Sequence, residues 1–183
     1  MVTCPVDCTP QTLETTWSQN NGSYGNYFKV RALKDITITG FEIHTRFNDI
    51  GTVQIYHKED DYVNFERNSG AWDRIMNDNN VQGRGIDVPT VLDSSKITPV
   101  EMLAGEFHSF YIHTSSELQI RYTNGNGEGN LYASNLHLEF YQGKGGGSTQ
   151  FNSLFSPRIW NGRINYGLTS TGPSPTSPPT NVS

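Results

Sequence analysis

The chain has 183 residues and a formal charge of −5, with 34% hydrophobic and only 17% charged residues. This length fits one domain around a single core. No basic stripe stands out that could neutralise phosphates, which argues against nucleic acid as a partner, and no run of 18 apolar residues occurs that could span a membrane. Met1 is not followed by a charged and then apolar leader, which leaves open a removed leader or an intracellular protein.

Residues 1–14 have little periodicity, and we expect them to form an extended N-terminal segment. Cys4 and Cys8, the only two cysteines, lie four positions apart in CPVDC. A zinc site needs two more ligands, and no histidine lies nearby at finger-like spacing, so we predict no metal site. We favour a small local disulfide between Cys4 and Cys8 over free or intermolecular thiols, and any disulfide requires an oxidising compartment.

The central part of the chain alternates apolar and polar residues in many short stretches, as half-buried strands do. Segments rich in Gly, Asn and Asp separate them, such as NDIG, NDNN, TNGNGEGN and QGKGGGS, and we expect these to be turns. This pattern predicts an all-β domain over residues 15–168, an antiparallel β-sandwich or jelly roll of eight to ten strands. The expected strands are YFKVRAL, ITITGFEIHTRF, GTVQIYHK, GIDVPTVLD, FHSFYIHTS, LQIRYT, NLHLEFY and RIWNGRINYG.

Two segments depart from regular strand alternation. The alternation in ITITGFEIHTRF slips at Gly40, which predicts a bulge or bend, as where a strand crosses between two sheets. In AWDRIMND the apolar residues have helical spacing, but we favour a strand there.

Residues 169–183 are almost wholly Thr, Ser, Pro, Gly and Asn. Because proline fixes φ and lacks an N–H, such a run favours polyproline II, and we expect a linker that projects from the domain. The run SPTSPPT is typical of O-glycosylated segments, and Asn21 and Asn181 begin N-glycosylation sequons. The chain is therefore predicted to carry covalent N- and O-linked glycans.

No arrangement of residues predicts catalysis. Acidic side chains that could serve a glycosidase lie beside turns, where we expect them to be solvated: Asp49, Glu59, Asp60, Asp61 and Glu66. The five histidines fall in expected strands, and the spacing of His108 and His113 places them on opposite faces. GKGGGST lacks the P-loop spacing and is expected to be a flexible turn, and the Asn/Asp clusters lack EF-hand spacing. We predict no enzyme activity and no cofactor.

The three tryptophans, Trp17, Trp72 and Trp160, have two possible uses. They fill the core of the sandwich, as large aromatic residues usually do, or they form a stacking surface for sugars. We favour the core.

Two resemblances follow from these segments. The tail SPTSPPT resembles the hydroxyproline-rich glycoproteins of algal and plant extracellular matrix. This resemblance implies hydroxylation and glycosylation at Pro173, Pro175, Pro178 and Pro179, with Ser174, Thr176, Ser177 and Thr180 as further attachment sites. The body, over residues 25–167, resembles secreted jelly-roll modules of microalgae and other aquatic microbes in ITITGFEIHT, FHSFYI and SPRIWNGRINY. A similar union of jelly roll and glycosylated linker occurs in glycoprotein filaments from fresh water.

Together these features lead to two expected functions. The first is a structural subunit of an extracellular glycosylated filament, which assembles head to tail with copies of itself through extended terminal segments. The second is a carbohydrate-binding or adhesion module on the stalk of a cell-surface protein.

Overall fold

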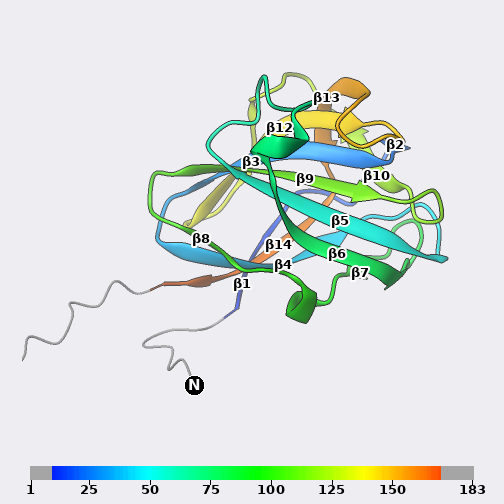
Figure 1. Ribbon diagram of the computed structural model, residues 1–183. Helices are drawn as coiled ribbons and strands as arrows, with labels where there is room; N and C mark the ends of the chain where they lie inside the picture. Colours follow the sequence, from blue (N-terminus) through cyan, green and yellow to red (C-terminus); the bar gives the residue numbers. More distant parts are fainter. Residues whose placement is uncertain (1–9, 170–183) are drawn as a thin grey trace, which may run out of the picture.

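Two antiparallel β-sheets face each other in the computed structural model, which describes residues 10–169 (Figure 1). The smaller sheet has five strands in the order β1-β14-β4-β7, and β8 also pairs with β4. Its strands are β1 (Gln11–Glu14), β4 (Ile36–Ile43), β7 (Thr90–Val91), β8 (Val100–Met102) and β14 (Gly162–Leu168). The prediction of an all-β antiparallel sandwich is confirmed.

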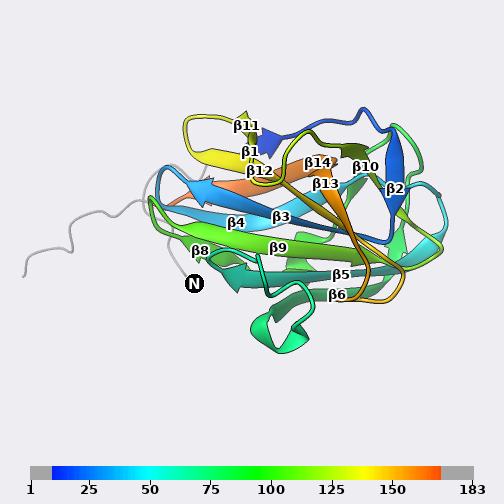
Figure 2. The ribbon, with the colours of Figure 1, turned by 90° about the horizontal axis from the view of Figure 1, so that it is seen from above.

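The larger sheet has nine strands in the order β2-β10-β13-β12-β3-β9-β5-β6, and β11 pairs with β12. Figure 2 shows the strands from β12 to β6 side by side. The members of this sheet are β2 (Asn21–Ser23), β3 (Gly25–Ala32), β5 (Ile50–Glu59), β6 (Asp73–Gln82), β9 (Phe107–Thr114), β10 (Ile120–Asn124), β11 (Leu131–Ser134), β12 (Leu138–Gly146) and β13 (Leu154–Trp160).

The main core lies between the sheets and is built around aromatic rings. Phe28, Phe110 and Phe140 point inward from the large sheet, and Phe41 points toward them from the small sheet. Trp160 is fully buried and stacks on Phe28 with 4.7 Å between ring centroids. Each such side chain stabilises the fold by about 1.5–3 kcal/mol through burial, so these rings hold the two sheets together.

A second aromatic cluster covers the outer face of the large sheet. Tyr27, Tyr56 and Tyr111 lie in a row on β3, β5 and β9, because Tyr111 pairs in register with both of the others. The rings of Tyr27 and Tyr111 stack with 3.9 Å between centroids. Tyr62 and Trp72, from the connection between β5 and β6, close over this row. This connection carries the short 3-10 helix η1 (Ser69–Ala71). The outer face of the sheet is therefore packed rather than open.

The structure tests the predictions for AWDRIMND and for the slip at Gly40. AWDRIMND is a strand, since β6 begins at Asp73. The bulge at Gly40 is present, because Asn165 pairs with Gly40 while Tyr166 pairs with Ile38, which leaves Thr39 as the extra residue. β4 itself stays in the small sheet, but the same stretch of chain reaches the large sheet just beyond it, because Thr45 bridges Ile120 of β10. The crossing therefore lies five residues after Gly40 rather than at it.

The glycine-rich stretch after Tyr141 differs from the expected flexible turn. Gly143, Gly145 and Gly146 belong to β12, between β3 and β13. The physical reason is space: a Cβ atom on Gly143 would lie 1.9 Å from the carbonyl oxygen of Tyr27. Glycine therefore lets two backbones approach closely inside a sheet.

The ends of the described chain lie together. β1 pairs with β14, so the small sheet already includes Gln11–Glu14, ahead of the domain start expected at residue 15. The predicted disulfide residues Cys4 and Cys8 and the predicted linker from residue 170 onward lie outside the described residues.

The close approach at Gly143 generates a prediction. Gly143→Ala should lower the free energy of unfolding by at least about 2 kcal/mol, because the new methyl group meets backbone that cannot move aside. Gly167→Ala is the matched control in β14, since its Cβ would meet nothing within 4 Å, and its effect should stay below about 1 kcal/mol. Urea denaturation measures both, and equal effects would contradict the packing argument.

Candidate functional site

A groove of about 660 Å³ lies between the edges of the two sheets, where β6 approaches β7 and the 3-10 helix η2 (Ser94–Lys96). We call it the edge groove. Its lining residues are Asp78, Asn80, Val81, Gln82, Arg84, Val88, Pro89, Val91, Asp93 and Lys96.

One wall of the edge groove is a free strand edge. β6 is the last strand of the large sheet and pairs only with β5. Within residues 10–169, its outer edge from Asn77 to Gln82 has no backbone partner. Such an edge presents N–H and C=O groups that another extended chain can pair with.

The opposite wall exposes aliphatic side chains. Val88 and Val91 line the edge groove, and Ile86 lies just before them; Val91 is 67% exposed. GIDVPTVLD was expected to form one strand. Only Thr90–Val91 pairs with β4, and the rest of the segment is irregular. Ile86, Val88 and Val91 are consequently left at the surface, while Leu92 is buried in the main core. The alternation in the sequence did not reveal this difference.

One ion pair lies in the edge groove, between Lys96 and Asp78. Lys96 Nζ donates to Asp78 Oδ2 at 2.8 Å, and the backbone N–H of Asn80 donates to Asp78 Oδ1 at 3.0 Å. The hydrogen bond from Lys96 is the main reason why the pKa of Asp78 lies below its ordinary value. Asp93 accepts from both the N–H and the hydroxyl of Ser95. With two acidic and two basic side chains, the lining carries no net formal charge.

The edge groove and the exit of the C-terminal segment lie at opposite ends of β4. Leu168, the last residue of β14, pairs with Ile36 at the start of β4. Thr90 of β7 pairs with Ile43 at its end. At about 3.3 Å per residue, these two points are separated by roughly 23 Å along the strand. Figure 1 likewise shows the end of β14 toward one side of the small sheet and β7 toward the other.

Of the predicted glycosylation residues, only Asn21 is described. It lies in β2, at the edge of the large sheet, and is partly buried. Its Nδ2 atom donates to Asn124 Oδ1 at 2.9 Å. The other predicted positions lie outside the described residues: Pro173, Ser174, Pro175, Thr176, Ser177, Pro178, Pro179, Thr180 and Asn181.

The acidic side chains beside the turns do not all lie in solvent. Asp49, Glu59 and Asp60 are exposed, as expected. Glu66 is buried and forms an ion pair with Lys144, which contradicts the expectation for this residue. Glu66 reaches this lysine of β12 because the β5–β6 connection folds onto the sheet. The spacing of residues in the sequence does not indicate this contact.

The histidines form one pair that the sequence did not predict. His57 Nε2 and His108 Nδ1 lie 2.8 Å apart on neighbouring strands, β5 and β9. His113 lies on the other face of β9, as its spacing from His108 predicted. His44 and His137 lie just outside β4 and β12 rather than in them. Within residues 10–169, no three His, Cys, Asp or Glu residues come close enough to hold a metal ion.

The tryptophans are mostly buried. Trp160 lies in the main core, as favoured, while Trp72 lies in the outer cluster instead. Trp17 is half-buried, with its ring 5.8 Å from that of His44. Neither Trp72 nor Trp160 is available as a stacking surface for sugars.

No protein-family model matches the chain, and no curated protein matches it significantly. None of the helices in the described part of the chain is long and apolar enough to span a membrane.

The histidine pair generates a prediction on pH. Burial lowers the pKa of His57 to about 4, and the neighbouring His108 adds to the effect. An unfolded histidine has a pKa of about 6.5, so the unfolded state takes up a proton first as the pH falls. Stability should therefore decrease between pH 6.5 and pH 4, by up to about 3 kcal/mol from His57 alone. Urea denaturation at pH 7 and pH 4.5 gives the free energy of unfolding at each pH. The difference between the two should be smaller in His57→Gln, because this variant lacks the contribution of His57. An unchanged decrease would contradict this assignment.

Proposed function

We propose that the chain is a structural subunit of an extracellular glycosylated filament that assembles head to tail. Residues 170–183 of one subunit would bind in the edge groove of the next. The observation that supports this best is the free edge of β6 beside exposed Val88 and Val91, at the far end of β4 from Leu168.

The positions of the C-terminal segment (the donor segment) and of the edge groove (its acceptor) favour a contact between subunits. The 14 residues from 170 to 183 span roughly 43 Å in polyproline II, at about 3.1 Å per residue. Leu168, near the last described residue, lies at the end of β4 opposite β7. A contact between two different surfaces of identical subunits repeats from copy to copy and produces a fibre unless it closes into a ring.

The chemistry of residues 170–183 also fits the edge groove. This segment contains no Asp, Glu, Lys, Arg or His, and the charged side chains of the groove compensate one another. In polyproline II the backbone carbonyls have no internal partners, so N–H groups on the outer edge of β6 could donate to them, except that of Asn80, which already donates to Asp78. The prolines would pack against Val88, Pro89 and Val91. The segment 1–9 suits the groove less well because it contains Asp7.

The alternative, a carbohydrate-binding or adhesion module on a stalk, has less support from the aromatic residues. Burial of Trp72 and Trp160 removes two of the three candidate stacking surfaces. The proposed role is non-enzymatic and needs no cofactor.

Assembly can be tested by removing the proposed donor. Deletion of residues 170–183 should abolish filaments in negative-stain electron microscopy and leave folded monomers, because Thr169 keeps its backbone hydrogen bond to Asp35. Val91→Glu should have the same effect from the acceptor side, since it places a charge on the apolar wall.

Leu136→Glu is the matched control for Val91→Glu. Leu136 is 82% exposed and lies between β11 and β12, away from the lining of the edge groove. It should assemble as the wild type does. Intact filaments after the deletion would refute the role of residues 170–183 in assembly. Intact filaments with Val91→Glu would refute the role of the edge groove.

Glycosylation can be tested by intact mass. Asn21→Gln should lower the mass of the secreted protein by one N-linked glycan, since β2 lies at a sheet edge where a transferase can reach it. Asn181→Gln gives the same test for the second sequon, and the glycans on residues 173–180 should remain after enzymatic removal of N-glycans. A mass equal to that of the bare polypeptide would contradict the proposal that the protein is a glycoprotein.

A further inference from the structure

The sequence of segment 170–183 follows a three-residue pattern. In polyproline II, residues three apart lie on the same side of the helix, so a segment in this conformation presents three rows of side chains. All four prolines of the segment fall in two of these rows. Every member of the third row carries a hydroxyl group, and we call it the hydroxyl row: Thr171, Ser174, Ser177, Thr180 and Ser183. A polyproline II helix of this sequence is therefore amphipathic.

The two rows that contain proline differ in their other members. One row ends in Asn181, which has a polar amide and begins a sequon: Gly172, Pro175, Pro178 and Asn181. The other row ends in a valine, and we call it the valine row: Ser170, Pro173, Thr176, Pro179 and Val182. Thr176 and Val182 add methyl groups to its two prolines. The valine row thus offers the most apolar surface of the segment.

The aliphatic wall of the edge groove matches the valine row in chemistry and in spacing. Val88 is 41% exposed and Val91 is 67% exposed, and Pro89 lies between them. The three-residue step from Val88 to Val91 spans at most about 11 Å of chain. Successive members of one row in polyproline II are about 9.3 Å apart. Two successive members can therefore contact both valines at once.

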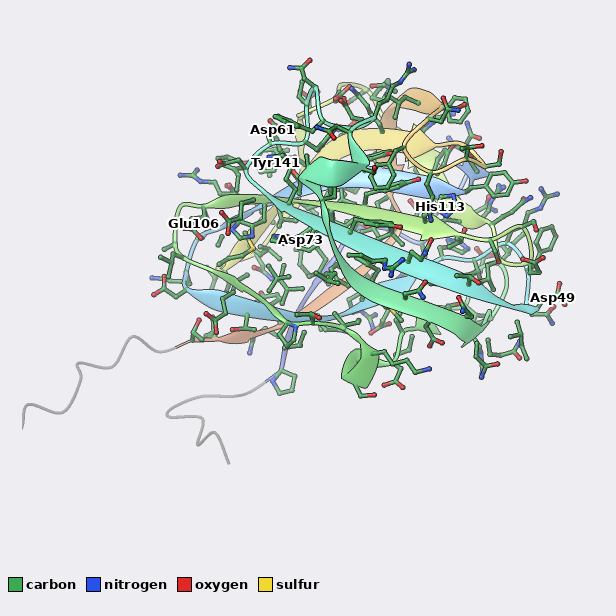
Figure 3. All side chains as sticks on the ribbon, viewed as in Figure 1. Asp49, Asp61, Asp73, Glu106, His113 and Tyr141 are labelled. Carbon is green, nitrogen blue, oxygen red and sulfur yellow. The ribbon has the colours of Figure 1, made fainter. Side chains whose placement is uncertain are left out.

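The opposite wall determines how much of the segment is held. In Figure 3, Asp73 marks the start of β6, and Asp49 lies beside its end, where the N–H of Gly83 donates to the carbonyl of Asp49 at 2.9 Å. Within the described residues, the outer edge of β6 from Asn77 to Gln82 has no backbone partner. A six-residue strand is about 20 Å long, which equals about two turns of polyproline II. Such a length accommodates three successive members of one row.

We propose that the valine row of one subunit binds in the edge groove of the next, and that a glycan on Thr176 prevents this contact. This inference rests on the proposed assembly through the edge groove. Thr176 is the third of five members, so any three successive members include it. Apolar side chains in contact approach to about 4.0–4.5 Å between heavy atoms. A sugar on the hydroxyl of Thr176 would occupy that space, whereas the hydroxyl row faces solvent.

Glycosylation of Thr176 is thereby the step that decides whether a subunit can join a filament. Pro173 and Pro179 flank Thr176 in the valine row and must likewise carry no glycan in an assembled subunit. Attachment sites in the other two rows are compatible with assembly: Ser174, Pro175, Ser177, Pro178, Thr180 and Asn181.

Two neighbouring residues test the choice of row. The full-length protein is produced without glycosylation, and the critical concentration for assembly is measured by sedimentation. Thr176→Asp should raise this concentration by at least about 10-fold, because it places a charge against the aliphatic wall. Ser177→Asp is the matched control and should leave it unchanged, since Ser177 belongs to the hydroxyl row. Thr176→Val should assemble at least as well as the wild type.

Mapping of glycans by peptide mass tests the regulatory role in glycosylated protein. Thr176 should be unmodified in filaments and modified in the unassembled fraction. A glycan on Thr176 in filaments, or none on it in the unassembled fraction, overturns this role. Deletion of residues 170–183 separates the two levels of the proposal. If the deletion abolishes filaments while Thr176→Asp and Ser177→Asp behave alike, the choice of row is wrong and the assembly stands. Filaments that survive the deletion refute both.

Discussion

The row of tyrosines on the outer face of the large sheet determines which surfaces remain open for binding. Tyr27, Tyr56 and Tyr111 cannot face water without exposing three large rings, so the β5–β6 connection folds over them and contributes Tyr62 and Trp72. This covering closes the broad face that sheet proteins often use for ligands. Binding is left to places where the cover ends. The edge groove lies beyond β6.

Ion pairs hold that cover in place. Lys144 of β12 bonds to Glu66 and lies 3.2 Å from Glu128, while Tyr62 Oη donates to Glu128 Oε1 at 3.1 Å. Burial alone would lower the pKa of Lys144, but its bonds to the two carboxylates outweigh this and raise it. A buried lysine with one partner removed is costly, so the three charges act as a unit. The cover is thereby fixed to the same strand whose glycines allow close packing against Tyr27.

The sequence predicted what local patterns determine. Alternation gave the strands and the sandwich, and the slip at Gly40 gave the bulge, because both depend on neighbouring residues. The sequence failed where distant segments meet. Nothing near Glu66 indicates Lys144, and His57 and His108 become neighbours only through the pairing of β5 with β9. Glycine runs were read as turns because their usual role is to adopt positive φ. In β12 they leave space instead: Gly143 for the backbone of Tyr27, and Gly145 and Gly146 for tyrosine rings.

Glycans on residues 170–183 and binding of this segment in the edge groove must be compatible if both proposals hold. Polyproline II has three residues per turn, so its side chains point in three directions about the axis. A groove between two sheet edges contacts one of these directions and leaves the others facing solvent. The row that packs against Val88 and Val91 must therefore be free of glycans, although it includes some of the predicted attachment sites, whereas glycans on the other two rows would not interfere. They would also restrict the free segment to extended conformations, which reduces the entropy lost when it binds to the next subunit.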